Sequence, residues 1–238
     1  FQQGGYFDLY VNSNEVLGIS VRGYDDGACC STYSKIGSTS LEPGVWYHVA
    51  AAYSESNDYM KIYLNGTEEA NYSLDEDFTM YDNNYYNRIG QFAGGQSEYS
   101  FDGIIDEFRI STVARTSFKF NTTFNTTIWS HPSAFTVKIN APPTITSVTV
   151  TPTTSQHYSE GGIIGAVDSK TLLYWNFDEA SGNKVEDSSP YDWYGNLDNY
   201  DDGQNPQRVS GLFSGGLDFE STDQGFVNLH NQIFIYKS

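Results

Sequence analysis

The sequence predicts an all-β protein, and more narrowly an antiparallel jelly-roll β-sandwich. Short stretches of alternating apolar and polar residues recur along the chain, and a period of two is that of a strand with one buried face. Turns rich in glycine, asparagine and aspartate separate these stretches. Aromatic residues make up 16% of the chain, with 19 Tyr, so the protein has enough apolar surface for a packed core.

In the first half of the chain the expected strands follow one another closely. Residues 6–22 (YFDLYVNSNEVLGISVR) predict a β-hairpin around the polar NSNE. Residues 44–54 (GVWYHVAAAYS) and 59–70 (YMKIYLNGTEEA) predict two more strands joined by the turn ESND. Residues 84–95 (NYYNRIGQFAGG) and 100–111 (SFDGIIDEFRIS) complete the series. Repeated short strands with such turns favour a sandwich, and no convincing helical pattern interrupts them.

Residues 116–169 have a different composition, because they are rich in Thr and β-branched residues and are punctuated by Pro. They predict an extended connector between domains or, alternatively, an edge strand that is donated to a neighbour. From residue 170 the strand pattern returns with TLLYW and an acidic, turn-rich loop. Residues 215–230 (GGLDFESTDQGFVNLH) predict two more short strands, and the final IFIYKS (233–238) again has the pattern of a strand.

The charge of the chain limits its partners. Only 12 Lys and Arg face 30 Asp and Glu, which gives a formal net charge of −18 and a pI of about 4.3. Such a field repels nucleic acid and anionic lipid, and it suits solubility in an exposed setting and binding of Ca²⁺. No apolar run is long enough to insert into a membrane. Phe1 is not a natural start, so we expect a mature or partial product whose export signal lies upstream.

Several motifs resemble a laminin-G-like, concanavalin A-like lectin/glucanase domain. GVWYHVAAAYSESNDYMKIYLNGT, NRIGQFAGG and FDGIIDEFRIS are similar to the second half of that jelly roll. LLYWNFDEASGNKVEDSSP and SGGLDFESTDQGFVNL are similar to its first half. The resemblance therefore implies a C-terminal half in residues 1–115, a connector in 116–169, and an N-terminal half in 170–238. The half that is C-terminal in the family therefore comes first in this chain.

Three arrangements fit this reversed order. The chain could fold on itself as a circular permutant, since closing a loop of about 50 residues costs only a logarithmic entropy term. Residues 170–238 could instead be completed by residues 1–115 of the next chain, in a filament or ring. The chain could also be one window of a longer tandem repeat. The start within a domain and the unfinished C-terminal strand favour the second and third. We expect each half to hold only half a core.

The resemblance implies a non-catalytic module of a secreted or cell-surface protein, acting in adhesion or as a subunit or repeat of a filament built by self-association. A monomeric carbohydrate-binding, lectin-like module is the alternative. Related glycoside hydrolases place carboxylates at alternate positions of one strand. Here Ile104 and Phe108 stand two positions from Asp106, and on a continuous strand Asp106 and Glu107 point to opposite faces. These substitutions predict that the protein is not an enzyme.

Calcium is the metal that the resemblance implies, as a structural ion near the meeting of the first and last strands of the domain. Carboxylate oxygens on neighbouring loops suit this ion. The alternative is a set of solvated turn acids with one buried acid that caps a loop. The candidate ligands are Asp178, Glu179, Asp187, Asp102, Asp106 and Glu107.

Aromatic side chains divide into core and loop positions. Trp46, Trp175 and His48 fall where the resemblance implies core or strand residues. Four aromatic residues in or beside loops are candidates for packing against a sugar, or for covering the rim of the sandwich: Tyr85, Tyr86, Trp193 and Tyr194.

Export of the chain would permit two modifications. Asn65, Asn71, Asn121 and Asn125 are N-glycosylation sequons, of which the last two lie in the connector. Cys29 and Cys30 are the only cysteines and are adjacent. They could form a vicinal disulfide, pair with another chain or stay reduced.

Overall fold

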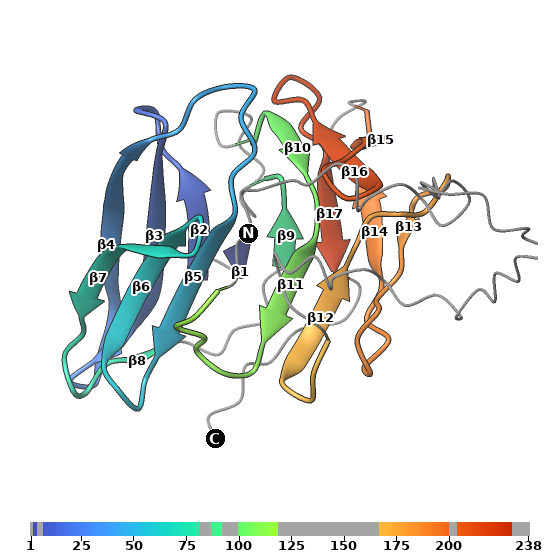
Figure 1. Cartoon of the computed structure of the whole chain (residues 1–238). Coiled ribbons are helices and arrows are strands. Elements are labelled where there is room, and N and C mark those ends of the chain that lie inside the picture. Colours follow the sequence, from blue (N-terminus) through green and yellow to red (C-terminus); the bar gives the residue numbers. More distant parts are fainter. Residues whose placement is uncertain are drawn as a thin grey trace, which may run out of the picture.

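The protein is an antiparallel β-sandwich, as the sequence predicts (Figure 1). The computed structural model describes residues 2–3, 7–80, 87–91, 100–118, 167–199 and 204–229. Within these ranges all regular elements are strands, and their pairings are antiparallel. No helix that could cross a membrane occurs in the described ranges.

The strands fall into two groups along the chain. The first group is β1 (Gln2–Gln3), β2 (Phe7–Val11), β3 (Val16–Asp25), β4 (Ala28–Ser40), β5 (Val49–Ser54), β6 (Tyr59–Leu64), β7 (Thr67–Ser73), β8 (Thr79–Met80), β9 (Asn87–Ile89), β10 (Gly103–Ile105) and β11 (Phe108–Ser111). The second is β12 (Thr171–Trp175), β13 (Lys184–Val185), β14 (Gly195–Asp198), β15 (Gln207–Ser210), β16 (Gly215–Phe219) and β17 (Phe226–Leu229).

One long sheet spans the molecule. Its order is β13-β14-β17-β9-β1-β2-β3-β4, with β8 paired to β3. Three smaller sheets complete the fold, with the orders β5-β6-β7, β10-β16-β15 and β11-β12. In Figure 1 the strands from β2 to β8 stand on the left, those from β12 to β17 on the right, and β1 and β9 between them.

One hydrophobic core, the local core, forms within a single continuous stretch of chain. Alternate residues of β3, namely Leu17, Ile19 and Val21, point into it, as the period of a strand requires. Its buried members are Leu17, Ile19, Val21, Met60, Ile62, Ala70, Leu74 and Phe78. We expected each half of the chain to hold only half a core, but the first half contains this complete one.

A second core, the shared core, draws on stretches that are far apart in sequence. Residues 172–229 contribute most of its buried side chains. Ile89 and the partly buried Phe101, Ile105, Phe108 and Ile110 come from the first half of the chain. The remaining members are Leu172, Leu173, Trp175, Phe177, Val185, Leu197, Leu217, Phe219, Val227 and Leu229, with Trp193 packed against them.

Three ladders join the two halves of the chain. β9 pairs with β17, β10 with β16, and β11 with β12. β1 then connects the shared core to the local core, because Gln2 and Gln3 pair with β9 on one side and β2 on the other. The chain thus completes its own sandwich, which is the first of the three arrangements that the reversed order allows.

Several strands differ from their expected bounds. The hairpin in 6–22 is confirmed as β2 and β3. The stretch 59–70 is two strands, because Asn65 and Gly66, with φ of 51° and 79°, form a tight turn between β6 and β7. The stretch 44–54 becomes a strand only at Val49, so Trp46 lies before β5 and is half-buried rather than a core residue.

Candidate functional site

The junction between the two halves contains several of the predicted metal ligands. It begins where the expected strand 100–111 breaks between β10 and β11. Glu107 has a φ of 58°, a left-handed conformation that ends the extended backbone. Asp106 and Glu107 therefore do not lie on opposite faces of one strand, and that expectation is wrong.

Asp106 and Glu107 both hold the second half of the chain. The Phe213 N–H donates to Asp106 Oδ2 at 2.7 Å. The Tyr174 hydroxyl, on a side chain that is 1% exposed, donates to Glu107 Oε2. Asp106 Oδ1 is buried and has no hydrogen-bond partner among the described residues. These acids are part of the packing between the halves.

Burial changes the ionisation of both acids. Burial, with a smaller contribution from the negative charge of Asp178, raises the pKa of Asp106 to about 7. Burial also raises the pKa of Glu107 to about 7, with smaller contributions from the charges of Asp106 and Asp178. The three carboxylates therefore repel one another when they are ionised.

The remaining predicted ligands have their own partners. Asp178 Oδ1 accepts from the Gly215 N–H at 2.8 Å. Glu179 forms an ion pair with Arg208, with 2.7 Å between Oε2 and the Arg208 nitrogen. The exposed Asp102 accepts from the Ser221 hydroxyl at 2.9 Å.

Asp187 organises the loop after β13. Its Oδ1 accepts from the N–H groups of Tyr174 and Ser189, at 2.9 and 2.8 Å. Its Oδ2 accepts from the Ser189 hydroxyl at 2.6 Å and from the Trp193 N–H at 2.8 Å. Four such bonds make Asp187 the acid that caps a loop, which the sequence offered as the alternative to a calcium ligand.

The six predicted calcium ligands do not form one metal site in this geometry. Among the described residues no three His, Cys, Asp or Glu side chains are placed to hold a metal ion together. Asp187 and Glu179 are occupied by backbone groups and Arg208. Asp106, Glu107 and Asp178 remain close enough to influence each other's charge. Calcium binding stays a prediction.

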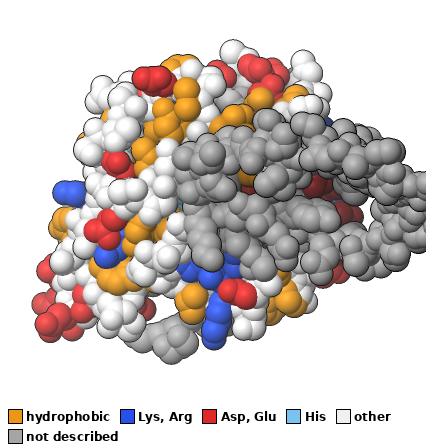
Figure 2. Space-filling view, in the orientation of Figure 1, with side chains coloured by type: hydrophobic (Ala, Val, Ile, Leu, Met, Phe, Trp, Pro, Cys, Tyr) orange, Lys and Arg blue, Asp and Glu red, His pale blue; other side chains and the backbone are white. Residues whose placement is uncertain are grey.

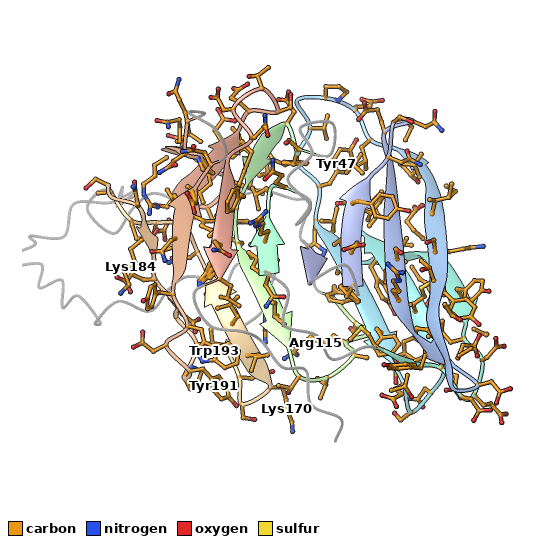
Figure 3. The ribbon with its side chains drawn as sticks, turned by 180° about the vertical axis from the view of Figure 1, so that it is seen from behind. Tyr47, Arg115, Lys170, Lys184, Tyr191 and Trp193 are labelled. Atoms are coloured by element: carbon orange, nitrogen blue, oxygen red, sulfur yellow. The ribbon has the colours of Figure 1, made fainter. Side chains whose placement is uncertain are left out.

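Two of the aromatic candidates, Trp193 and Tyr194, lie directly before β14. Trp193 packs against the shared core, and its ring centroid is 5.6 Å from that of Tyr191. Tyr191 is 48% exposed, so this pair presents one open ring and one supported ring (Figure 3). Lys184 Nζ lies 4.7 Å from the centre of the Tyr194 ring. Tyr85 and Tyr86 lie outside the described residues.

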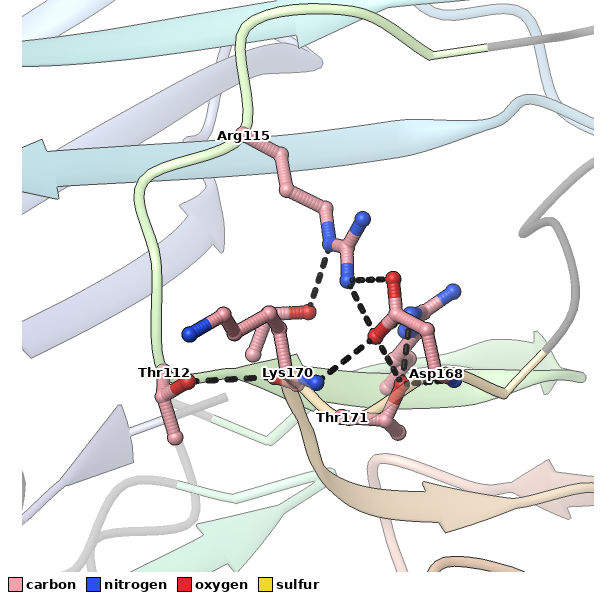
Figure 4. A network of polar contacts seen from close by, with 7 residues as sticks. Thr112, Arg115, Asp168, Lys170 and Thr171 are labelled. Carbon is pink, nitrogen blue, oxygen red and sulfur yellow. Dashed lines mark hydrogen bonds and ion pairs between the residues drawn. The ribbon is translucent and has the colours of Figure 1, made fainter.

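A polar network joins the two ends of the connector (Figure 4). Arg115 donates to both oxygens of Asp168 at 2.8 Å, and Arg109 forms an ion pair with Asp168 at 3.2 Å. Arg109 also donates to the Thr171 hydroxyl at 2.5 Å, and the Thr112 N–H donates to the Lys170 carbonyl at 2.9 Å. We call these six residues the clasp. The sequence did not predict the clasp. The only signal that could have indicated it is that these residues lie at the two ends of the connector.

The other candidates divide between described and undescribed residues. Asn71 is exposed on β7, whereas Asn65 accepts the His48 N–H at 2.9 Å within its turn. Asn121, Asn125 and the side chains of Cys29 and Cys30 lie outside the description, although the cysteine backbone is part of β4.

His48 and Trp175 both fit a structural role. The His48 ring lies 5.5 Å from that of Phe118, and burial lowers its pKa to about 4. Trp175 is 1% exposed, and its indole N–H donates to the Trp193 carbonyl at 2.9 Å, so its expected core position is confirmed.

Comparison with known families agrees with this geometry. Residues 1–118 match the laminin-G model of the concanavalin A-like lectin/glucanases superfamily. The chain carries a laminin-G-like domain. Searches of curated proteins and of solved structures gave no match. The laminin-G-like match ends at Phe118, which is also the last described residue before Val167.

The superfamily narrows the function only broadly. A laminin-G-like sandwich fits an extracellular module that binds carbohydrate or serves adhesion. Such domains are generally non-catalytic.

Proposed function

We propose that the chain is a non-catalytic structural module of an extracellular surface, and that copies assemble by completing each other's sandwiches. The shared core supports this proposal, because its two parts are separate stretches of chain that meet within one copy here and have the same surfaces to offer between copies. Residues 172–229 bury Trp175, Phe177 and Phe219 against strands that come from the other half of the chain. Without β9, β10 and β11 these residues would leave strand edges and apolar surface open to water.

The surface charge suits a protein that works outside the cell. Figure 2 shows Asp and Glu side chains at several places on one face, with fewer Lys and Arg. With a net charge of −18, self-repulsion keeps free copies soluble. Assembly must then come from specific strand pairing rather than from general attraction.

Light scattering and electron microscopy of the protein isolated from its native source test the assembly. We expect the mass to rise with protein concentration and regular polymers to appear, which dissolve in denaturant into chains of this length. Larger chains after denaturation would indicate a tandem-repeat polypeptide instead. A protein that stays monomeric at every concentration would contradict assembly.

Glycan binding is the second candidate function, and the exposed Tyr191 ring beside Trp193 favours it. The CH face of a sugar packs on an open aromatic ring, and the Asp187 loop holds this pair in place. Figure 3 shows the pair at the same end of the molecule as Lys170 and Arg115.

Calorimetric titration with a panel of neutral oligosaccharides tests this candidate. Tyr191→Ala is expected to weaken binding about tenfold or more, as the loss of one stacking ring does. Tyr24→Ala is the matched control, because Tyr24 is similarly exposed, at 45%, but lies on β3. Equal effects of the two substitutions, or no saturable binding, would contradict a glycan site at Tyr191.

A further inference from the structure

The boundary between the two cores does not coincide with the boundary between the two halves of the chain that the sequence motifs define. All members of the local core lie between Phe7 and Phe78. All members of the shared core lie between Ile89 and Ile110 or between Leu172 and Leu229. Residues 7–80 are therefore complete without the second half, whereas residues 87–118 and 167–229 need each other.

Among the described residues, the strand pairings of residues 167–229 with the first half all involve β9, β10 or β11. The three ladders pair Ile89 with Val227, Ile104 with Asp218 and Ile110 with Leu173, among others. The Ser221 hydroxyl, the Phe213 N–H and the Tyr174 hydroxyl donate across the halves to carboxylates of the segment 102–107. In the opposite direction, the Thr112 N–H donates to the Lys170 carbonyl, and the arginines of the clasp donate to Asp168 and Thr171. A single surface thus receives the second half.

The covalent link permits this surface to receive a different copy. Residues 119–166 connect Phe118 to Val167, and a peptide of 48 positions can span up to about 160 Å. Both ends of the link lie beside the clasp, where Arg115 and Asp168 are 2.8 Å apart. Every contact of the junction can therefore form between two chains as well as within one.

We infer that residues 167–229 are an exchangeable unit, which docks on β9, β10 and β11 of a second copy while residues 7–80 stay folded with their own chain. This inference rests on the proposed assembly function and names its interface. Reciprocal exchange between two copies gives a closed dimer. Exchange in one direction leaves one unit and one acceptor surface free, so it can continue into a filament or ring.

Disulfide trapping between full-length chains tests the inference. Ile104 and Asp218 are directly opposite on β10 and β16, at a separation that suits a disulfide. One chain carries Ile104→Cys and the other Asp218→Cys, both in a background of Cys29→Ser and Cys30→Ser. The two chains are unfolded, mixed and refolded together at high concentration, since linked segments compete with free ones up to about the millimolar range.

A matched pair controls for chance collisions. Ser20 and Ser34 face each other on β3 and β4, within the sandwich of the local core, and their hydroxyl oxygens are 3.1 Å apart. Chains with Ser20→Cys and Ser34→Cys are mixed in the same way. Each double variant, with both thiols in one chain, shows that its pair can form a disulfide.

We expect a covalent heterodimer from the Ile104→Cys and Asp218→Cys chains that is about tenfold more abundant than from the control pair. Oligomers without this heterodimer, or with equal trapping of the control pair, would leave assembly standing and overturn the exchange surface. Chains that remain monomeric and trap only within the double variants would overturn both.

Discussion

The local core and the shared core use the same sandwich geometry but depend on the chain in different ways. The local core closes between strands of one continuous stretch, residues 7–80, through short turns. The shared core joins Ile89–Ile110 to Leu172–Leu229 across the connector. The entropy cost of closing the connector loop comes before the contacts of the shared core can form. The shared core is therefore expected to fold more slowly than the local core and to separate from it more easily. The two regions should therefore respond differently to the same kind of change.

Truncation of a core side chain is expected to have the largest effect on the free energy of unfolding. It should also show whether the two cores unfold in separate transitions. Trp175→Ala removes the indole from the shared core and should cost about 3–5 kcal/mol. Met60→Ala in the local core, where Met60 is fully buried, should cost about 2–5 kcal/mol. Calorimetric unfolding should show an early transition of the shared core in the first variant only. One common transition in both variants would contradict independent cores.

A fall in pH should lower the stability of the local region and raise that of the shared core. The pKa of His48 in the folded local sandwich is about 4, below its ordinary value of 6.5, so stability there is lost as the pH falls through this window. Asp106 and Glu107 have folded pKa values of about 7, above the unfolded values of 3.8 and 4.5. Their contribution is present at low pH and is lost as the pH rises from about 4 to 7.

Melting curves between pH 4 and 8 would measure this opposition. Asp106→Asn and Glu107→Gln keep a hydrogen-bond acceptor and remove the charge, so they should flatten the response of the shared core alone. His48→Gln should flatten only that of the local sandwich. A shared core that becomes more stable from pH 5 to pH 8 would contradict the raised pKa values.

Calcium should act on the shared core and leave the local core unchanged. An ion that binds beside Asp106 and Glu107 would relieve the repulsion between these two carboxylates. We expect millimolar Ca²⁺ at pH 8 to add about 1–2 kcal/mol to the stability of the shared core. Scanning calorimetry with Ca²⁺ or with a chelator measures this. The same shift in Asp106→Asn would place any bound ion elsewhere.

Among the features tested, the clasp should contribute least to the stability of the protein. Its Arg115 and Asp168 side chains are 28% and 44% exposed, so water and salt screen the ion pair. Arg115→Ala should cost about 1 kcal/mol or less, and the loss should shrink at high salt. Glu69→Ala is a useful control in the local sandwich, because Glu69 accepts four hydrogen bonds from Ser38 and Thr39 without an ion pair. Equal salt dependence of the two losses would contradict an ionic clasp.

The sequence predicted the local region better than the shared one. Alternation identified β2 and β3, and ESND the turn between β5 and β6, because each signal lies within a few residues. β13 has only two residues, and β15 buries none of its four residues fully, so no alternation marked either strand. The break at Glu107 arises because β10 and β11 pair with different strands, a tertiary cause that local sequence does not carry.

The candidate site shows the same contrast. The motifs FDGIIDEFRIS and NFDEASGNKVEDSSP identified Asp106, Glu107 and Asp187 as candidate site residues. They did not indicate which residues these acids would contact. The role of Asp187 depends on the backbone of Tyr174 and Trp193, and that of Arg115 on Asp168 beyond the connector. Tyr191 was overlooked beside Trp193, since exposure of a ring in YDWY is set by the fold of its loop.

The position of the clasp also determines how the domain would bear mechanical load. The connector is attached at the end of the β11–β12 ladder where Ser111 faces Thr171. Tension that draws Phe118 and Val167 apart would load Arg115 and Asp168 first and then peel the ladder one pair at a time toward Phe108 and Trp175. Peeling needs less force than sliding strands past each other, so optical-tweezer pulling from these two points should open the shared core at low force. Resistance as high as for shear would contradict this peeling geometry.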